Sequence, residues 1–178
     1  YVIPAGPVRA PLVDQFRQVD AVLKLGDGDG ADRLVRMAAR AARPFYEATI
    51  APVNAGRLER RSILAFAGTA APEQFFELVR RAGGCIEIER VFADGHIYAD
   101  DELQELARAA DAAGLDIVTT ARDAVRLAHG SQVATDMLQR LVTLQAELFF
   151  EVAGTPATIV RDTLELGRRR QHAMMAGV

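Results

Sequence analysis

One polar stretch of the sequence, residues 94–101, carries the side chains best suited to acid–base chemistry. Asp94 and His96 stand two residues apart in it, and Asp100 and Asp101 follow shortly after. The stretch comes directly after an apolar run typical of a strand, and loops that follow strands often hold catalytic groups in α/β proteins. Such a set can orient a general base or hold a divalent ion through water. An exposed loop whose aspartates cap the next helix fits the same residues, so the spacing leaves both interpretations open.

A second polar cluster, Thr119, Thr120 and Asp123, falls where another predicted strand ends. Thr120 can cap the following helix, with Asp123 three residues later in the register of a capping box. By themselves these residues favour a structural role at the start of that helix. The other two histidines, His129 and His172, have no partner at the spacing of metal ligands.

The sequence contains no Walker loop. That loop needs a glycine-rich turn ending in lysine and then Ser or Thr, because the ammonium group reaches the β and γ phosphates. Lys24 is the only lysine, and Leu25 follows it. We therefore expect no phosphate-binding loop within this chain.

The segment GDGDG, residues 26–30, has the glycine and aspartate content of a calcium loop. Asp27 and Asp29 stand at the first and third positions of an EF-hand loop, but Ala31 and Ala38 occupy the fifth and twelfth. The twelfth position requires a bidentate glutamate. We therefore expect a turn here, in keeping with the turn preference of glycine.

The composition restricts the class of protein. The chain has 178 residues, 50% hydrophobic and 25% charged, which suits one or two compact α/β units with a core. A net charge of -3 gives no overall basic field for nucleic-acid binding. The one cysteine, Cys85, has no internal disulfide partner, and no apolar run reaches the roughly 20 residues that cross a bilayer, so we expect any membrane association to be peripheral. The opening at Tyr1, followed by an apolar dipeptide and Pro4, leads us to expect a fragment that starts inside a domain.

Short apolar runs alternate with helical patterns along most of the chain. Strands are expected at 62–68, 85–92, 116–120 and 144–152, and helices at 72–82, 100–113, 121–129, 132–140 and 156–171. This alternation predicts a three-layer α/β fold, with a mainly parallel sheet flanked by helices. The loops after the first three of these strands should then face one side of the sheet.

The first part of the chain reads as a different unit. Strands are expected at 19–25 and 45–53, with a helix at 31–42 between them. Residues 53–61, VNAGRLERR, are the best candidate for a linker. We therefore expect three regions: 1–52, the linker 53–61, and 62–178.

Four segments, in the right order, resemble the tetraacyldisaccharide 4'-kinase (lipid A 4'-kinase) family. IPAGPVRAP (Ile3 to Pro11) is similar to PAGPLREP, and AFAGTAAPEQFF (Ala65 to Phe76) to AFAGIGNPERFF. FADGHIY (Phe92 to Tyr98) is similar to FxDHHxY, and TTARDAVRL (Thr119 to Leu127) to TTEKDAVKL. Each segment alone is a weak signal, but four in order with compatible spacing are specific.

The resemblance implies a two-lobed, P-loop kinase-like protein of which this chain is the carboxyl-terminal part. It implies an enzyme that uses ATP and Mg²⁺ to phosphorylate the 4' hydroxyl of a lipid A disaccharide precursor. It places that enzyme peripherally at the cytoplasmic face of the bacterial inner membrane. Residues 1–52 would be the end of the nucleotide-binding lobe, and 62–178 the carboxyl-terminal lobe. The Walker loop and the acidic magnesium ligands would precede this chain, so the fragment alone would be inactive.

Site residues carry over from the family one by one. Asp94 and His96 match the aspartate and the second histidine of the DHH segment, which makes them the candidate catalytic residues; Gly95 stands at the first histidine. The candidate substrate- or phosphate-binding residues are Arg9, Thr119, Thr120 and Asp123. Other departures are Ala10, at an acidic position, and Ala121 and Arg122, at the glutamate and lysine of TTEKD.

Two rival interpretations remain. A diverged, inactive relative that serves as a binding or scaffold module is favoured by Ala10 and Gly95. An unrelated α/β small-molecule binder would require all four segments to be chance matches.

Overall fold

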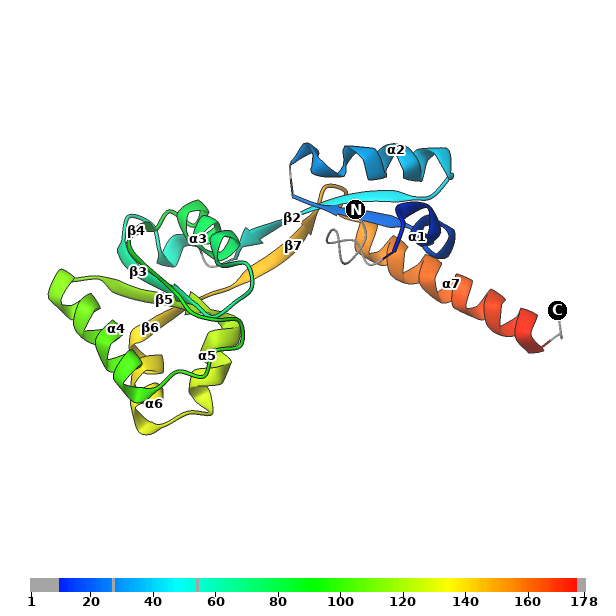
Figure 1. Cartoon of the computed structure of the whole chain (residues 1–178). Helices are drawn as coiled ribbons and strands as arrows, with labels where there is room; N and C mark the ends of the chain where they lie inside the picture. The colour runs from blue at the N-terminus through cyan, green and yellow to red at the C-terminus, as the bar shows by residue number, and fades with distance from the viewer. Residues whose placement is uncertain (1–9, 27, 54, 176–178) are drawn as a thin grey trace. The chain divides into compact units, whose positions relative to one another are not determined.

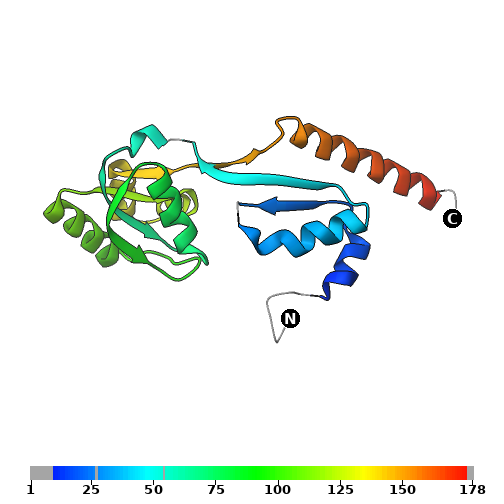
Figure 2. The ribbon, with the colours of Figure 1, turned by 90° about the horizontal axis from the view of Figure 1, so that it is seen from above.

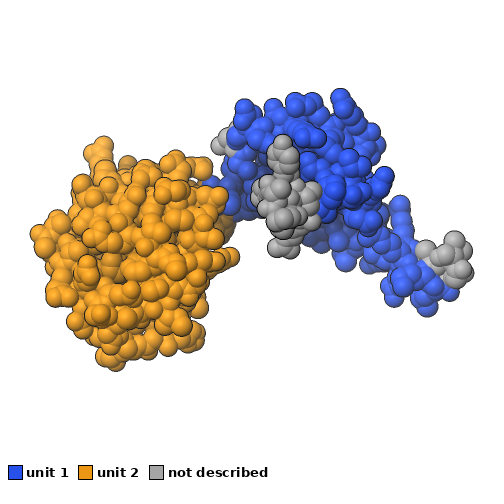
Figure 3. Space-filling view, in the orientation of Figure 1, with its two compact units in different colours: residues 1–50, 148–178 blue, residues 51–147 orange. Residues whose placement is uncertain are grey.

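The computed structural model describes residues 10–26, 28–53 and 55–175. The chain divides into two compact units, residues 1–50 together with 148–178, and residues 51–147 (Figure 3). It therefore passes from one unit to the other twice. The sequence placed all residues after 62 in one region, whereas the structure groups residues 148–178 with the first unit.

Unit 2, residues 51–147, is built on a four-stranded sheet (Figure 1). Its strands lie in the order β4-β3-β5-β6, and every neighbouring pair is parallel. The strands are β3 (Ser62–Ala67), β4 (Cys85–Val91), β5 (Asp116–Thr120) and β6 (Leu141–Leu144). The helices between them are α3 (Pro72–Arg81), α4 (Asp100–Ala113), α5 (Ala121–Ala128) and α6 (Gln132–Arg140). The predicted parallel sheet flanked by helices is confirmed.

Strand β3 shows why this unit has three layers. Its side chains alternate between two hydrophobic clusters, because successive residues of a strand point to opposite faces. Ile63 and Ala65 pack with Phe76 of α3, while Leu64 and Phe66 pack with residues of α4, α5 and α6. A strand buried on both faces reads as a continuous apolar run, which is how SILAFA appears in the sequence. Truncating Phe76, which has no exposed surface, to alanine would cost about 3–5 kcal/mol.

Glycine and glutamate fix the ends of α4. Gly114 ends the helix in the left-handed region, at φ 65°, where glycine carries no Cβ penalty. At the other end the cap residue is Ala99, so the prediction that Asp100 or Asp101 caps this helix was wrong. Both aspartates lie in the first turn, and the side chain of Glu102 reaches back to accept a hydrogen bond from the Ala99 backbone N–H.

Unit 1 contains a three-stranded sheet in the order β1-β2-β7 (Figure 2). Its strands are β1 (Val22–Leu25), β2 (Phe45–Pro52) and β7 (Ala146–Phe150), and β1 and β2 are parallel. The Glu151 N–H bonds to the Glu47 carbonyl and the Val53 N–H to the Gln145 carbonyl, so residue numbers rise along β2 as they fall along β7 and the pair is antiparallel. The helices are α1 (Leu12–Gln18), α2 (Asp32–Arg40) and α7 (Thr155–Met175), and two short 3₁₀ turns are η1 (Asp29–Ala31) and η2 (Ala55–Arg57).

Buried apolar residues are concentrated in unit 2. Both hydrophobic clusters consist of residues between Ala55 and Leu144. Among the described residues of unit 1, the buried apolar side chains are Ala38 and Ala48. No helix among the described residues combines the length and apolar content needed to cross a bilayer.

Candidate active site

The loops after three strands of unit 2 meet at Gly68, the residue that follows β3. The Gly95 N–H bonds to the Gly68 carbonyl at 3.2 Å, which brings in the loop after β4. The Gly68 N–H bonds to the Asp123 Oδ2 at 3.2 Å, which brings in the turn after β5. The prediction that these loops face one side of the sheet is confirmed.

Asp123 lies at the centre of this arrangement and has no exposed surface. Its Oδ2 accepts hydrogen bonds from the Gly68 N–H and, at 2.6 Å, from the Thr120 hydroxyl, while its Oδ1 accepts one from Arg126 Nη1 at 2.6 Å. The Thr120 hydroxyl also accepts the Asp123 backbone N–H, which confirms the predicted cap of α5. Arg126 donates a further bond to the Gly68 carbonyl at 3.0 Å. The carboxylate is thus an ion-paired link between the loop after β3 and α5.

Thr119 is buried beside this link. Its hydroxyl donates to the Phe66 carbonyl at 2.8 Å, and the residue has no exposed surface. Thr119, Thr120 and Asp123 are therefore brought together as predicted. Their polar atoms are bonded within the protein, so they shape the backbone around Gly68.

Tyr98 closes the space beside Gly68. Its ring meets Phe66 and Phe92 edge to face, at centroid distances of 5.4 and 5.0 Å. A Cβ atom on Gly68 would lie 3.0 Å from the Tyr98 hydroxyl and 3.1 Å from Asp123 Oδ1. The hydroxyl is buried and makes no hydrogen bond of ordinary geometry with any described residue. Burial, and then the negative charge of Asp123, raise the pKa of Tyr98 above its ordinary value of 10.0, so the hydroxyl keeps its proton at neutral pH.

His96 lies on the loop after β4, held between aromatic rings. Its ring stacks on Phe92 at a centroid distance of 4.9 Å and meets Tyr98 edge-on at 5.1 Å. Its Nε2 lies 2.8 Å from Oε2 of Glu102, and the same oxygen accepts the Ala99 N–H at 2.9 Å. The Ala99 hydrogen bond first, and then the His96 hydrogen bond, hold the pKa of Glu102 below its ordinary value of 4.5.

The two candidate catalytic residues, Asp94 and His96, differ in their contacts. Asp94 is exposed, and no hydrogen bond or ion pair joins its side chain to another described residue. His96 pairs with Glu102 rather than with Asp94. Arg9, the fourth candidate for substrate or phosphate binding, lies outside the described residues.

Sequence reasoning missed Glu102, Tyr98, Arg126 and Gly68. Two of them carried a local signal: Glu102 stands three residues after the cap position of α4, and Arg126 stands three residues after Asp123, within reach on one helix face. The places of Tyr98 and Gly68 depend on contacts between distant segments, which no local pattern shows.

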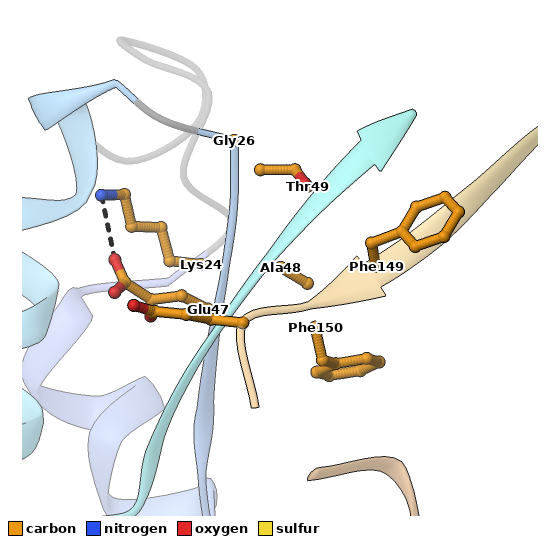
Figure 4. Close-up of a pocket in the computed structure, with 8 residues that line it drawn as sticks. Lys24, Gly26, Glu47, Ala48, Thr49, Phe149 and Phe150 are labelled. Atoms are coloured by element: carbon orange, nitrogen blue, oxygen red, sulfur yellow. Dashed lines mark hydrogen bonds and ion pairs between the residues drawn. The ribbon is translucent and has the colours of Figure 1, made fainter. Parts of the chain in front are cut away.

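Lys24, the only lysine of the sequence, lines a hollow in unit 1. Its lining includes Lys24 of β1, Glu47 of β2 and Phe149 of β7 (Figure 4). Lys24 Nζ forms an ion pair with Glu47 Oε1 at 3.2 Å. Gly26, at φ 86°, directly follows β1, and the 3₁₀ turn η1 begins at Asp29, so the described part of the GDGDG segment turns as predicted; Asp27 lies outside the described residues. Among the described residues, no group of three or more His, Cys, Asp or Glu gathers as a metal site would need.

Residues 1–164 match the family model described as LpxK, tetraacyldisaccharide-1-P 4'-kinase. The chain belongs to this family. Similar curated proteins named tetraacyldisaccharide 4'-kinase include those of Mesorhizobium japonicum, 46% identical over 170 residues, and Sinorhizobium fredii, 40% identical over 171 residues. Each alignment covers 96% of this chain and 49% of the relative, so the chain spans about half the length of the kinases it matches.

A solved structure has a similar fold. LpxK from Aquifex aeolicus, determined in complex with ATP, matches with a TM-score of 0.50 and 17% identity. The match covers 90% of this chain and 47% of the Aquifex chain. At this identity the likeness concerns the fold, and it agrees with the predicted α/β class.

Proposed function

We propose that this chain is the carboxyl-terminal part of an ATP-dependent lipid kinase that phosphorylates the 4' hydroxyl of tetraacyldisaccharide 1-phosphate in lipid A biosynthesis. Membership of the LpxK family supports the reaction class. The share of the relatives that the chain spans supports a partial protein. ATP and Mg²⁺ would be bound mainly by residues outside this chain, since Lys24 is ion-paired and no Walker loop occurs in the sequence.

The convergence of three loops at Gly68 is the observation that carries this proposal. Phosphoryl transfer depends mainly on positioning and on stabilisation of charge, and a side chain must orient the attacking hydroxyl. The hydrogen bonds of Gly68 to Asp123 and Gly95 fix the loop that carries Asp94 and His96. In this proposal Asp94 and His96 act on the acceptor hydroxyl, and the three loops that meet at Gly68 form one wall of the site that binds the acceptor.

The remaining candidates act around this wall. Thr119, Thr120 and Asp123 contribute to substrate or phosphate binding indirectly, by fixing the backbone of the Gly68 loop. Arg9 supplies a cation for a phosphate group. Residues 1–50, with 148–178, form the end of the nucleotide-binding lobe, and residues 51–147 form the acceptor-side lobe. The enzyme works peripherally at the cytoplasmic face of the inner membrane, where a tetraacylated substrate would reside.

One observation favours a second candidate function, an inactive relative that binds without catalysis. Gly95 stands where the family motif has its first histidine, and its φ of 76° is a conformation that side chains with a Cβ rarely adopt. The loop is therefore built for glycine at this position. Such a protein would bind the lipid A precursor and transfer no phosphate.

Transfer of labelled phosphate from ATP to the disaccharide by the full-length protein distinguishes the two functions. The kinase proposal expects transfer that depends on added Mg²⁺ and is lost when the Walker lysine of the complete protein is replaced. Transfer no greater than that of the Walker variant would reject the kinase and favour the binding module.

Replacement of His96 tests the assignment of the site. We expect His96→Ala to lower turnover at least about tenfold, because general acid–base groups contribute about 10²–10⁴-fold. His129→Ala is the matched control, since His129 caps the carboxyl end of α5, the end opposite Thr120. Equal turnover in the two variants would remove His96 from the catalytic set.

A further inference from the structure

We propose that Glu102 is a positioning residue that holds His96 in one tautomer and one orientation for phosphoryl transfer, an inference that rests on the function proposed above. Glu102 lies outside the four segments that resemble the kinase family. It belongs to the first turn of α4, whereas His96 belongs to the preceding loop. The pair therefore joins a helix end to the loop that carries the candidate catalytic residues.

The Glu102 carboxylate is held in place by the backbone as well as by the histidine. Its Oε2 accepts the Ala99 N–H at 2.9 Å, which anchors the side chain to the backbone where α4 begins. The same oxygen lies 2.8 Å from Nε2 of His96. The two side chains are 33% and 26% exposed, so the contact is partly shielded from water.

The charge of Glu102 determines which ring nitrogen carries the proton. An ionised carboxylate can only accept hydrogen bonds, so Nε2 of His96 must donate. In the neutral ring Nδ1 is then the acceptor, and among the described residues nothing donates a hydrogen bond to it. Because the pKa of Glu102 is held below its ordinary value, chiefly by the Ala99 N–H, the carboxylate is ionised at neutral pH.

The orientation of the ring is set by its neighbours. Phe92 covers one face at an interplanar angle of 24°, and Tyr98 meets the ring at 82°. Phe92 and Tyr98 themselves pack against the buried cluster under α4. Gly95, at φ 76°, makes the turn in which the His96 N–H bonds to the Ala93 carbonyl at 3.0 Å. The family motif has two histidines here, and in this chain the turn at Gly95 positions the one that remains, His96.

In the transfer step, Nδ1 of His96 accepts the proton of the acceptor hydroxyl. As the acceptor oxygen forms its bond to the γ-phosphorus of ATP, its proton passes to Nδ1 of His96. The bond from that phosphorus to the bridging oxygen breaks, and its electron pair leaves with ADP. The imidazolium so formed is stabilised by the Glu102 carboxylate at Nε2, as a carboxylate does for a catalytic histidine in other enzymes.

Three variants of the full-length protein test the proposal: Glu102→Gln, Glu102→Ala and the control Glu105→Gln, at an exposed position on the same helix. Glu102→Gln keeps an oxygen for the Ala99 N–H and removes only the charge. We expect kcat to fall about tenfold or more in both Glu102 variants, with KM for ATP within about twofold of the unchanged protein. Glu105→Gln should keep the original kcat. A kcat within twofold of the original in Glu102→Gln would overturn the proposal.

Nitrogen-15 NMR of histidine-labelled protein gives a readout that does not depend on activity. The His96 signal is assigned by its loss from the spectrum of His96→Ala. We expect the Nε2–H tautomer in the original protein and a mixture of tautomers in Glu102→Ala. A dominant Nδ1–H tautomer in the original protein would overturn the proposal. If no variant transfers phosphate, the proposed function fails, and the tautomer still decides whether Glu102 positions His96.

Discussion

Asp123 carries the strongest single-residue constraint in the candidate site. A carboxylate without exposed surface is tolerated only when it is paired and hydrogen-bonded, because removing a charge from water costs several kcal/mol. Arg126, Thr120 and the Gly68 N–H meet this requirement. Since Arg126 also binds the Gly68 carbonyl, the pair both neutralises a buried charge and fixes the loop after β3.

Asp123→Asn should therefore destabilise the protein strongly. The amide keeps the shape of the carboxylate but leaves Arg126 without its counter-charge, so we expect a loss of about 3 kcal/mol or more in the free energy of unfolding. The measurement is urea denaturation. Asp116→Asn is the matched control, because its ion pair with Arg61 is exposed and should contribute less than about 1 kcal/mol. Similar losses in both variants would contradict a special role for the buried pair.

Gly68→Ala tests the close packing at the junction of the loops. The added Cβ would lie 3.0–3.2 Å from the Tyr98 hydroxyl, Asp123 Oδ1 and the Ala93 carbonyl, and the last of these is backbone. We expect a loss of about 1–3 kcal/mol in the free energy of unfolding, since the neighbours have to move. In Gly56→Ala the Cβ would meet no atom within 4 Å, and that variant should be neutral or more stable by up to about 1 kcal/mol. If thermal and urea unfolding give Gly68→Ala and Gly56→Ala the same stability, the packing around Gly68 is looser than these distances indicate.

Glu102 should make the stability of the protein depend on pH. Its pKa in the folded state lies below the ordinary value of 4.5, so its contribution to stability is present above pH 4.5 and is lost as the pH falls through the folded-state pKa. Glu102→Gln should be less stable than the original protein at pH 7, and the difference should shrink steadily below pH 4.5. Urea titrations at several pH values measure this difference. A gap that stays constant from pH 7 to pH 3 would show that the charge of Glu102 does not contribute.

The elements of unit 2 could largely be predicted from the sequence, because each is a continuous apolar run or a helical repeat with a clear end. Pro72 in the first turn of α3 and Gly114 after α4 are examples. The predicted strand 144–152 contains β7 (Ala146–Phe150), whereas β6 (Leu141–Leu144) lies before it except for Leu144 and was not predicted. β6 pairs with β5 and β7 with β2, in different sheets, and no local pattern reveals the partner of a strand. Helix α1 was missed because its sequence, LVDQFRQ, is only seven residues long and buries none of them.

The candidate site could be predicted only in part. Thr120 and Asp123 carry a local capping signal, and the structure shows the corresponding hydrogen bond at 3.0 Å. The pairing of His96 with Glu102 had a weaker signal, because the loop geometry around Gly95 decides whether the ring reaches the helix. The meeting of Gly68 with Asp123 joins residues 55 positions apart, which sequence spacing does not show.

The cap of α5 offers a test at the scale of an element. Thr120→Ala removes the hydroxyl that accepts the Asp123 N–H and donates to Asp123 Oδ2, so we expect a loss of about 1–2 kcal/mol in the free energy of unfolding. Thr120→Ser keeps the hydroxyl and should recover most of that loss. Urea denaturation of both variants measures the difference, and an equal loss would show that the methyl group rather than the cap matters.

For the whole molecule, the division into units coincides with an unequal distribution of core. Both buried clusters belong to unit 2, and the described part of unit 1 buries few apolar side chains. Unit 2 is also one continuous stretch, residues 51–147, whereas unit 1 combines residues from both ends of the chain.

Residues 51–147 should therefore fold when expressed alone. A domain of this size with two clusters on a four-stranded sheet is expected to unfold in one cooperative transition. This segment has no tryptophan, and its one tyrosine is Tyr98. Circular dichroism and the fluorescence of Tyr98, followed during urea denaturation, should therefore give coincident transitions. Residues 1–50 alone should show no cooperative transition, because β2 would lack its partner β7.

The double passage of the chain also sets an order of events during translation. Strand β2 leaves the ribosome before nearly all of unit 2, but β7, which lies beside it in the sheet, emerges only after nearly all of that unit has been synthesised. In the interval one edge of β2 has no neighbour, and such an edge is open to pairing with other nascent chains. Rapid folding of the inserted unit shortens the path between β2 and β7 and so limits the time that this edge stays uncovered.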